Sequence, residues 1–290
     1  MAPHDASDEL TLGQCATLAI VMEVTAPKPG NVHRGADFED VTYPDFIVAA
    51  TAIGPVFDRA AESSVGQTVL AAVEATRRLV GSNTNLGTIL LLAPLAKVPR
   101  GADWQQGITD VLSHLNWADA RDVYAAIRLA QPGGLGKVAV ADIADAAPQD
   151  LLAAMRLAAD RDLVARQYAD NFADVLTVVV PALESSLATG LSIGQSIVRT
   201  HLTLMSQFPD SLIARKCGKA TAERSAHLAG QVLAAGQPGD DAYEFALGEL
   251  DFWLRSDHHQ RNPGTSADLI AAGLFVTLRD GIIKPPLRLA

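Results

Sequence analysis

The chain has 290 residues, of which 49% are hydrophobic and 5% are aromatic, and its formal net charge is -10. This apolar content is sufficient for a substantial core, built mainly from Ala, Leu, Val and Ile. The acidic balance argues against DNA, RNA or an anionic membrane as a partner, because those surfaces bind clustered Lys and Arg. A bound phosphate would therefore have to meet a local positive site.

Cys15 and Cys217 are the only cysteines, and both lie in or near stretches that read as helix. A disulfide framework is therefore not expected, and a reducing cytoplasm is the expected location. Residues 1–9 lack the basic and apolar pattern of a signal peptide, so we expect a disordered tail there and a single helical domain over 10–290. The most apolar stretch, 88–98, is much shorter than the roughly 20 residues that cross a bilayer.

Alanine, leucine and charged residues recur at three- and four-residue spacing over most of the chain, whereas strict alternation of strand length is scarce. This pattern predicts an all-α fold, a multi-helix globular bundle. The predicted helices are 10–24, 43–62, 66–80, 86–97, 103–114, 119–130, 149–180, 182–190, 192–207, 211–235, 240–256 and 266–280. Residues 134–147 could form a short strand or an extended loop.

Three polar strings rich in glycine and proline stand out, each next to an apolar helical run. They are Glu23-Val-Thr-Ala-Pro-Lys-Pro-Gly30, Gly81-Ser-Asn-Thr-Asn-Leu-Gly87 and Arg261-Asn-Pro-Gly-Thr-Ser-Ala-Asp268. A simple connecting loop does not need so many amides, hydroxyls and charges beside residues that allow close backbone approach. We expect the three strings to form one anion-binding site.

In the first string, helical spacing places Glu23 on the inward face of its helix. A buried carboxylate needs a cation or several donors, so Glu23 either serves a site or forms an ion pair with Lys28. Lys28 would also supply some of the local positive charge that the acidic chain otherwise lacks.

The second string lies at the start of an apolar helix. Asn83, Thr84 and Asn85 supply amides and a hydroxyl, and Gly87 lets the backbone approach a ligand, which together predict a phosphate cradle. The string is neither a Walker loop nor a dinucleotide fingerprint. A helix N-cap is the alternative interpretation.

The third string also opens a helix. Thr265 and Asp268 have the spacing of a capping box, which would explain both residues structurally. In the functional interpretation, Asp268 holds a metal or a substrate hydroxyl, while Thr265 and Ser266 meet phosphate.

Two further sets of charged residues are candidates. Arg215 and Lys216 precede a glycine, so they are either basic residues of a helix C-terminus or a clamp for phosphate. On the predicted helix 149–180, Asp160 and Asp174 share one face, which is either solvated or supplies magnesium ligands.

The three strings, in this order and separation, resemble the triphosphoribosyl-dephospho-CoA synthase family over roughly residues 15 to 280. The resemblance implies an all-α enzyme that takes ATP and 3′-dephospho-CoA, releases adenine and joins the triphosphoribosyl group to the acceptor ribose. It implies Mg²⁺ and ATP in the site, with Glu23 or Asp268 near the developing positive charge of the sugar. The resemblance also implies that Glu23, Lys28, Pro29 and Gly30 shape one wall of the site, while Lys28, Arg215 and the amides of 83–87 would meet the triphosphate.

The sequence also departs from the family pattern. The best-known members carry His-Lys-Gly after the Asn-Thr pair, where this chain has Asn85-Leu86-Gly87. This difference indicates a divergent branch, which could act on another phosphorylated intermediate, for example of a one-carbon carrier. A hydrolase of nucleotides or N-glycosides and a non-catalytic nucleotide sensor are the other hypotheses; an oligomer is compatible with the sequence.

Overall fold

The computed structural model describes residues 9–131 and 147–288. The predicted tail lies outside these ranges except for Glu9, and the segment 134–147 lies outside them except for Ala147. Within the described ranges the fold is all-α, as predicted, and the only β-type pairing is an isolated bridge between His33 and Ala36. Over the same ranges, no helix has both the length and the apolar character that crossing a membrane requires.

The helices of the N-terminal half are α1 (Leu12–Thr25), α2 (Tyr43–Phe57), α3 (Val65–Leu79), α4 (Leu86–Lys97), α5 (Trp104–Ser113) and α6 (Trp117–Ala130). Those of the C-terminal half are α7 (Leu151–Ala158), α8 (Leu163–Ala169), the π-helix η2 (Val175–Val179), α9 (Val180–Ala188), α10 (Ile193–Gln207), α11 (Ser211–Cys217), α12 (Lys219–Ala235), α13 (Asp241–Arg255) and α14 (Gly264–Arg279).

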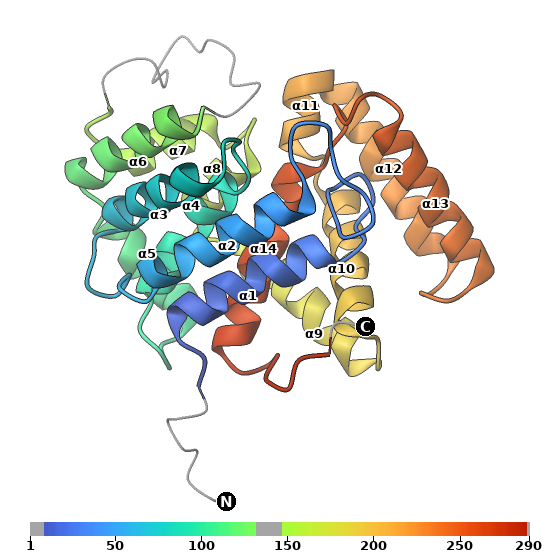
Figure 1. Ribbon diagram of the computed structural model, residues 1–290, viewed down its shortest axis with the longest axis horizontal. Helices are drawn as coiled ribbons and strands as arrows, with labels where there is room; N and C mark the ends of the chain where they lie inside the picture. The colour runs from blue at the N-terminus through green and yellow to red at the C-terminus, as the bar shows by residue number, and fades with distance from the viewer. Residues whose placement is uncertain (1–8, 132–146, 289–290) are drawn as a thin grey trace, which may run out of the picture.

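Helix α14 runs through the centre of the molecule. In Figure 1 it lies behind α1 and α2, with α3–α8 on one side and α10–α13 on the other. It packs against α1, α4, α8, η2, α9, α10 and α11. Its residues 269–279 are all buried, as expected for a helix that is apolar all round. Gly273 allows η2 to come close, since a Cβ there would lie 2.4 Å from Cγ1 of Val179.

Several helices begin where the sequence supplies a capping box. Thr11 and Gln14 start α1, Ser64 and Gln67 start α3, and Ser192 and Gln195 start α10. In each pair the first side chain accepts from the third amide of the helix, and the glutamine side chain accepts from the cap amide. These starts are therefore fixed by local sequence.

Two predicted long helices are wrong. The predicted helix 149–180 is broken after α7, where Asp162 caps the start of α8, and again at Asn171 and Phe172, whose φ angles are 51° and 58°. The predicted helix 211–235 is broken at Gly218, whose φ of 88° separates α11 from α12. Residues with positive φ follow α8 and α11 and end these two helices, and both helices pack against α14.

The loop that follows α1 is fastened to α13. The amide of Gly30 donates to Oδ1 of Asp251 at 2.7 Å, and the Arg255 guanidinium donates to the carbonyl of Asn31 at 2.6 Å. Gly30 has a φ of 75°, and a Cβ there would lie 2.8 Å from Cβ of Leu254. Glycine is therefore required here for both backbone conformation and space.

We expect Gly30→Ala to lower the free energy of unfolding by about 2–3 kcal/mol, since it adds a steric clash to the strain of a left-handed alanine. Gly101→Ala is the matched control, because Gly101 has a φ of 76° and nothing within 4 Å of its would-be Cβ. Urea unfolding of both variants measures the difference. Equal losses would show that the contact with Leu254 contributes nothing.

Candidate active site

A single cavity of about 1150 Å³ is lined by segments from across the chain. The lining comes from α1, residues 31–41 of the following loop, the start of α2, the loop 82–87 with the start of α4, the end of α6, α7, α8 and α11, and residues 258–268. The predicted convergence of the three polar strings is therefore observed, because Glu23, Asn83 and Asp268 all line this cavity.

The contact between Asp268 and the start of α4 joins two of the strings. Oδ1 of Asp268 accepts from the Thr88 hydroxyl at 2.7 Å, and a Cβ on Gly87 would lie 2.1 Å from Oδ2. Gly87 therefore leaves the space that the carboxylate occupies. Burial raises the pKa of Asp268 to about 7; the Thr88 hydrogen bond opposes this, and the negative charge of Glu23 adds to it.

The start of α4 presents polar groups that are only partly paired. Asn85 precedes the helix without capping it by its side chain, and the contact from the Leu86 amide to Oδ1 of Asn83 is long, at 3.3 Å. Nδ2 of Asn85 is buried and has no hydrogen-bond partner within the described residues. A buried donor without a partner costs free energy unless a ligand or water meets it, which favours a binding role for this turn.

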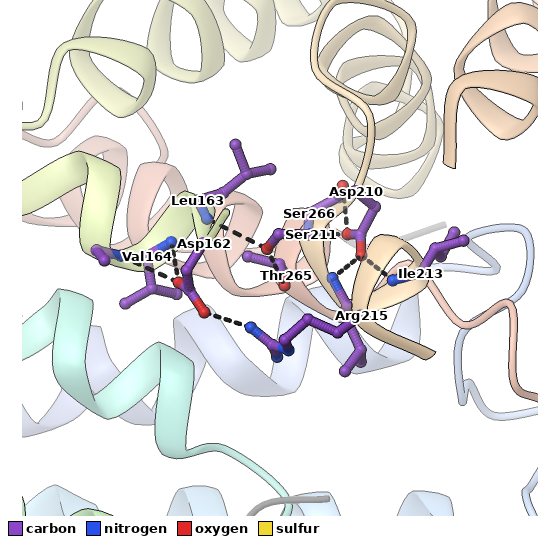
Figure 2. Close-up of polar contacts among 11 residues, drawn as sticks. Asp162, Leu163, Val164, Asp210, Ser211, Ile213, Arg215, Thr265 and Ser266 are labelled. Carbon is purple, nitrogen blue, oxygen red and sulfur yellow. Dashed lines mark hydrogen bonds and ion pairs between the residues drawn. The ribbon is translucent and has the colours of Figure 1, made fainter. Parts of the chain in front are cut away.

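The starts of α8, α11 and α14 are held together by one polar network, shown in Figure 2. Asp210, fully buried, accepts from the amides of Leu212 and Ile213 with one oxygen and from the amide and hydroxyl of Ser266 with the other. Burial raises the pKa of Asp210, and these four donors oppose the shift.

Ser211 continues this network, because its hydroxyl donates to Oγ1 of Thr265 at 3.0 Å and accepts from the Leu163 amide at 3.2 Å. The capping-box interpretation of Thr265 and Asp268 is wrong: α14 starts at Gly264, and these two side chains bind other helices.

Positive charge collects at this end of the cavity. Arg161, Arg215 and Lys216 all line it, and Arg128 lies on the α6 side. Arg215 forms an ion pair with Asp162, the residue that caps α8, as Figure 2 shows. Arg161 and Lys216 are exposed toward solvent, so their charges are available to an anion.

Glu23 reaches the cavity wall as part of an ion pair. Its Oε1 lies 2.8 Å from Nζ of Lys28, whose side chain is fully buried and also contacts the carbonyls of Glu23 and Ala26. Burial raises the pKa of Glu23, and the Lys28 charge opposes the shift. Of the two interpretations of Glu23, the ion pair is thus observed, and the carboxylate still borders the cavity.

The predicted site residues divide into two groups. Those that line the cavity are Glu23, Asn83, Thr84, Asn85, Gly87, Arg215, Lys216, Thr265 and Asp268; those that do not are Lys28, Pro29, Gly30, Ser266, Asp160 and Asp174. The hydroxyl and amide of Ser266 are bound to Asp210, so they are not directed to a phosphate in this structure. The roles of the lining residues stay predictions.

The structure gives no support to the two predicted magnesium ligands. Their common helix does not exist: Asp160 lies exposed between α7 and α8, and Asp174 accepts from Arg166 and Gln167 at 2.9 and 2.7 Å. In the part of the chain that is described, no group of three or more His, Cys, Asp or Glu side chains could hold a metal ion.

Sequence reasoning missed Asp162, Asp210, Ser211 and Arg161. Asp162 and Asp210 could have been found as helix N-caps, since each precedes an apolar helical turn. Nothing local indicates that the helices they start would meet.

Residues 9–285 match the model of the ATP:dephospho-CoA triphosphoribosyl transferase (CitG) family. The chain belongs to this family. It is 26% identical over 287 residues to the 2-(5″-triphosphoribosyl)-3′-dephosphocoenzyme-A synthase of Klebsiella pneumoniae, covering 94% of this chain and 96% of that protein. A crystal structure from Archaeoglobus fulgidus, designated a triphosphoribosyl-dephospho-CoA synthase, matches with a TM-score of 0.62 and 27% identity, over 80% of this chain and 98% of the other.

Membership of this family confirms the predicted enzyme class, a transferase of coenzyme biosynthesis. The cavity, to which all three polar strings contribute, is accordingly the candidate active site of a triphosphoribosyl transferase-like enzyme.

Lys28→Met should lower the free energy of unfolding by about 3–5 kcal/mol, because it leaves the Glu23 carboxylate buried without its cation. The double variant Glu23→Gln, Lys28→Met should recover a large part of that loss, since no charge then remains unpaired. Urea unfolding near pH 7 measures both. A single variant as stable as the wild type would mean that the ion pair does not stabilise α1.

Asp268→Asn should stabilise the protein, and more strongly at high pH. The folded-state pKa of Asp268, about 7, exceeds the ordinary Asp value of 3.8. The wild type therefore loses stability as the pH rises from about 4 to about 7, while the asparagine variant does not titrate at this position. The advantage of the variant should grow by about 3 kcal/mol between pH 5 and pH 8.5 in urea unfolding. A constant advantage would contradict the raised pKa.

Proposed function

We propose that this protein transfers the triphosphoribosyl group of ATP to a hydroxyl of an acceptor, with dephospho-CoA as the first candidate, and releases adenine. The observation that carries the proposal is the position of Asp268. Its carboxylate lies against the opening turn of α4, in the cavity that also exposes Arg161 and Lys216. A sugar with its triphosphate needs a carboxylate and several cations within one site.

The triphosphate would occupy the cationic end. Lys216 and Arg161 supply charge, Arg215 supplies a planar donor fork next to Asp162, and the unpaired amide of Asn85 supplies a neutral donor. The N-terminus of α4 adds its partial positive charge. These groups together can neutralise an anion that the chain, with its net charge of -10, would otherwise repel.

Asp268 would act at the sugar. The acceptor oxygen attacks C1′ of the ribose while the bond from C1′ to N9 of adenine breaks, so the sugar gains positive charge. Ionised Asp268 stabilises that charge and takes the proton of the acceptor hydroxyl. The leaving adenine takes a proton from water, and Asp268 afterwards returns its proton to water, so that the protons balance. A carboxylate with a pKa of about 7 suits proton transfer near neutral pH.

Magnesium would enter with the substrate. Since the described residues provide no cluster of three ligands, the ion would be held chiefly by phosphate and water oxygens, as is usual for Mg²⁺ bound to a nucleotide. The chemistry it supplies is neutralisation of the triphosphate charge.

A different acceptor is the second candidate. Asn85-Leu86-Gly87 replaces the His-Lys-Gly of the best-known members, and Asn85 and Gly87 line the cavity. A neutral amide at this point changes how the site meets its ligands. A phosphorylated intermediate of a one-carbon carrier therefore belongs in the acceptor panel.

Incubation with ATP, Mg²⁺ and dephospho-CoA should release free adenine, detected by chromatography, together with a triphosphoribosylated acceptor. The value of kcat/KM should rise with pH through about 7 as Asp268 ionises. Asp268→Asn should lower kcat by about 10²- to 10⁴-fold and remove this pH dependence.

The control reaction omits the acceptor. Adenine released without acceptor would identify a hydrolase, and the absence of adenine with every acceptor in the panel would refute the transfer reaction. Asp280→Asn is the matched control variant, since Asp280 contacts Trp104 at the far end of α14 and does not line the cavity. It should retain full activity.

A further inference from the structure

One part of the cavity lining is apolar. Val24, Val32 and Phe38 form a small apolar cluster, separate from the main core, against which Val41 and Phe46 pack. All five line the cavity. This part of the lining therefore offers apolar surface to a ligand.

An aromatic pair adjoins the apolar cluster, because Phe38 belongs to both. The rings of Phe38 and His259 are stacked, with centroids 4.1 Å apart and planes inclined by 26°. Both residues line the cavity, and the two come from loops more than 200 residues apart in the chain. Nδ1 of His259 is buried and has no hydrogen-bond partner within the described residues.

The loop that carries His259 is held firmly in an uncommon conformation. His258 and His259 have φ angles of 47° and 58°, which few residues other than glycine adopt without cost. Arg261 fixes the loop, because it donates to the Trp253 carbonyl at 2.6 Å and pairs with Asp257 at 3.2 Å. Strain of this kind persists where the surroundings enforce it, and it concentrates at ligand sites.

The charges that line the cavity near His259 favour a neutral ligand group over a phosphate. Glu39, Asp40 and Arg255 all act electrostatically on His259, but Arg255 is paired with Asp251 and does not line the cavity, whereas the two carboxylates do. Burial lowers the pKa of His259, so its ring stays neutral near pH 7. Carboxylates repel phosphate, but they accept hydrogen bonds from an amino group. An uncharged aromatic base with an exocyclic amine fits both features.

We propose that Phe38 and His259 form the stacking platform for an adenine base, with the rim carboxylates Glu39 and Asp40 directed to its exocyclic amine. The proposal rests on the proposed function, in that the triphosphate meets the cationic residues of the same cavity. Both ATP and dephospho-CoA carry adenine, and the experiment below separates the two sources.

Two variants test the platform while leaving the main core unchanged. Phe38→Leu keeps an apolar side chain but loses the aromatic ring, and His259→Asn keeps a polar residue that tolerates positive φ but loses the stacking surface. Phe252→Leu is the matched control, since Phe252 is 72% exposed on α13 and does not line the cavity. Circular dichroism and urea unfolding check that each variant is folded.

Equilibrium binding is measured by calorimetry for ATP, for dephospho-CoA and for inorganic tripolyphosphate, which has no base. Each platform variant should weaken ATP or dephospho-CoA binding by at least about tenfold, and the ligand affected identifies whose adenine is stacked. Tripolyphosphate binding should stay within about twofold of the wild type. Phe252→Leu should change none of the three.

Unchanged binding of ATP and of dephospho-CoA in both platform variants would overturn the proposal. A loss of tripolyphosphate binding as large as the loss of nucleotide binding would also overturn it, because it would indicate a general collapse of the cavity. These outcomes are independent of turnover. A protein that binds ATP through the platform but releases no adenine would refute the transfer reaction and leave the platform standing.

Discussion

The close approach of Asp268 to the backbone of Gly87 is the contact on which the site depends. It brings the central helix α14 against the opening turn of α4, and it is feasible only because residue 87 has no side chain. The contact gives the carboxylate its hydrogen bond from Thr88 and removes it from water, which raises its pKa to about 7. Packing of the central helix and the acid-base property of the site thus have one origin.

A second set of contacts keeps the cavity in place around this carboxylate. Asp210 and Ser211 join the starts of α11 and α14, and Ser211 also binds the start of α8. Because helix N-termini repel one another through their dipoles and favour negative charge, a buried aspartate among them offsets that repulsion. On the opposite side, the pair of Glu23 and Lys28 closes the wall formed by α1.

Two kinds of side chain line the cavity. Arg161, Arg215 and Lys216 supply positive charge, whereas Phe38 and His259 supply a pair of stacked rings. A nucleotide likewise combines phosphates with an aromatic base. The proposed binding mode therefore matches each of these ligand groups to lining side chains of suitable chemistry, with the sugar near Asp268.

What the sequence determined by itself was local. Three- and four-residue spacing predicted the all-α fold, capping boxes such as that of Ser64 and Gln67 marked helix starts, and the three polar strings indicated the site and the family.

Partners distant in the chain were decided only by the tertiary structure. Thr265 and Asp268 have the spacing of a capping box, yet they bind Ser211 and Thr88, and Asp174, on a predicted long helix, is held by Arg166 and Gln167. Likewise, Phe38 and His259 carry no shared motif, and their stacking exists because the loops after α1 and α13 are packed together. Spacing reports which residues share a face, whereas contacts between faces depend on the packing of all the helices around α14.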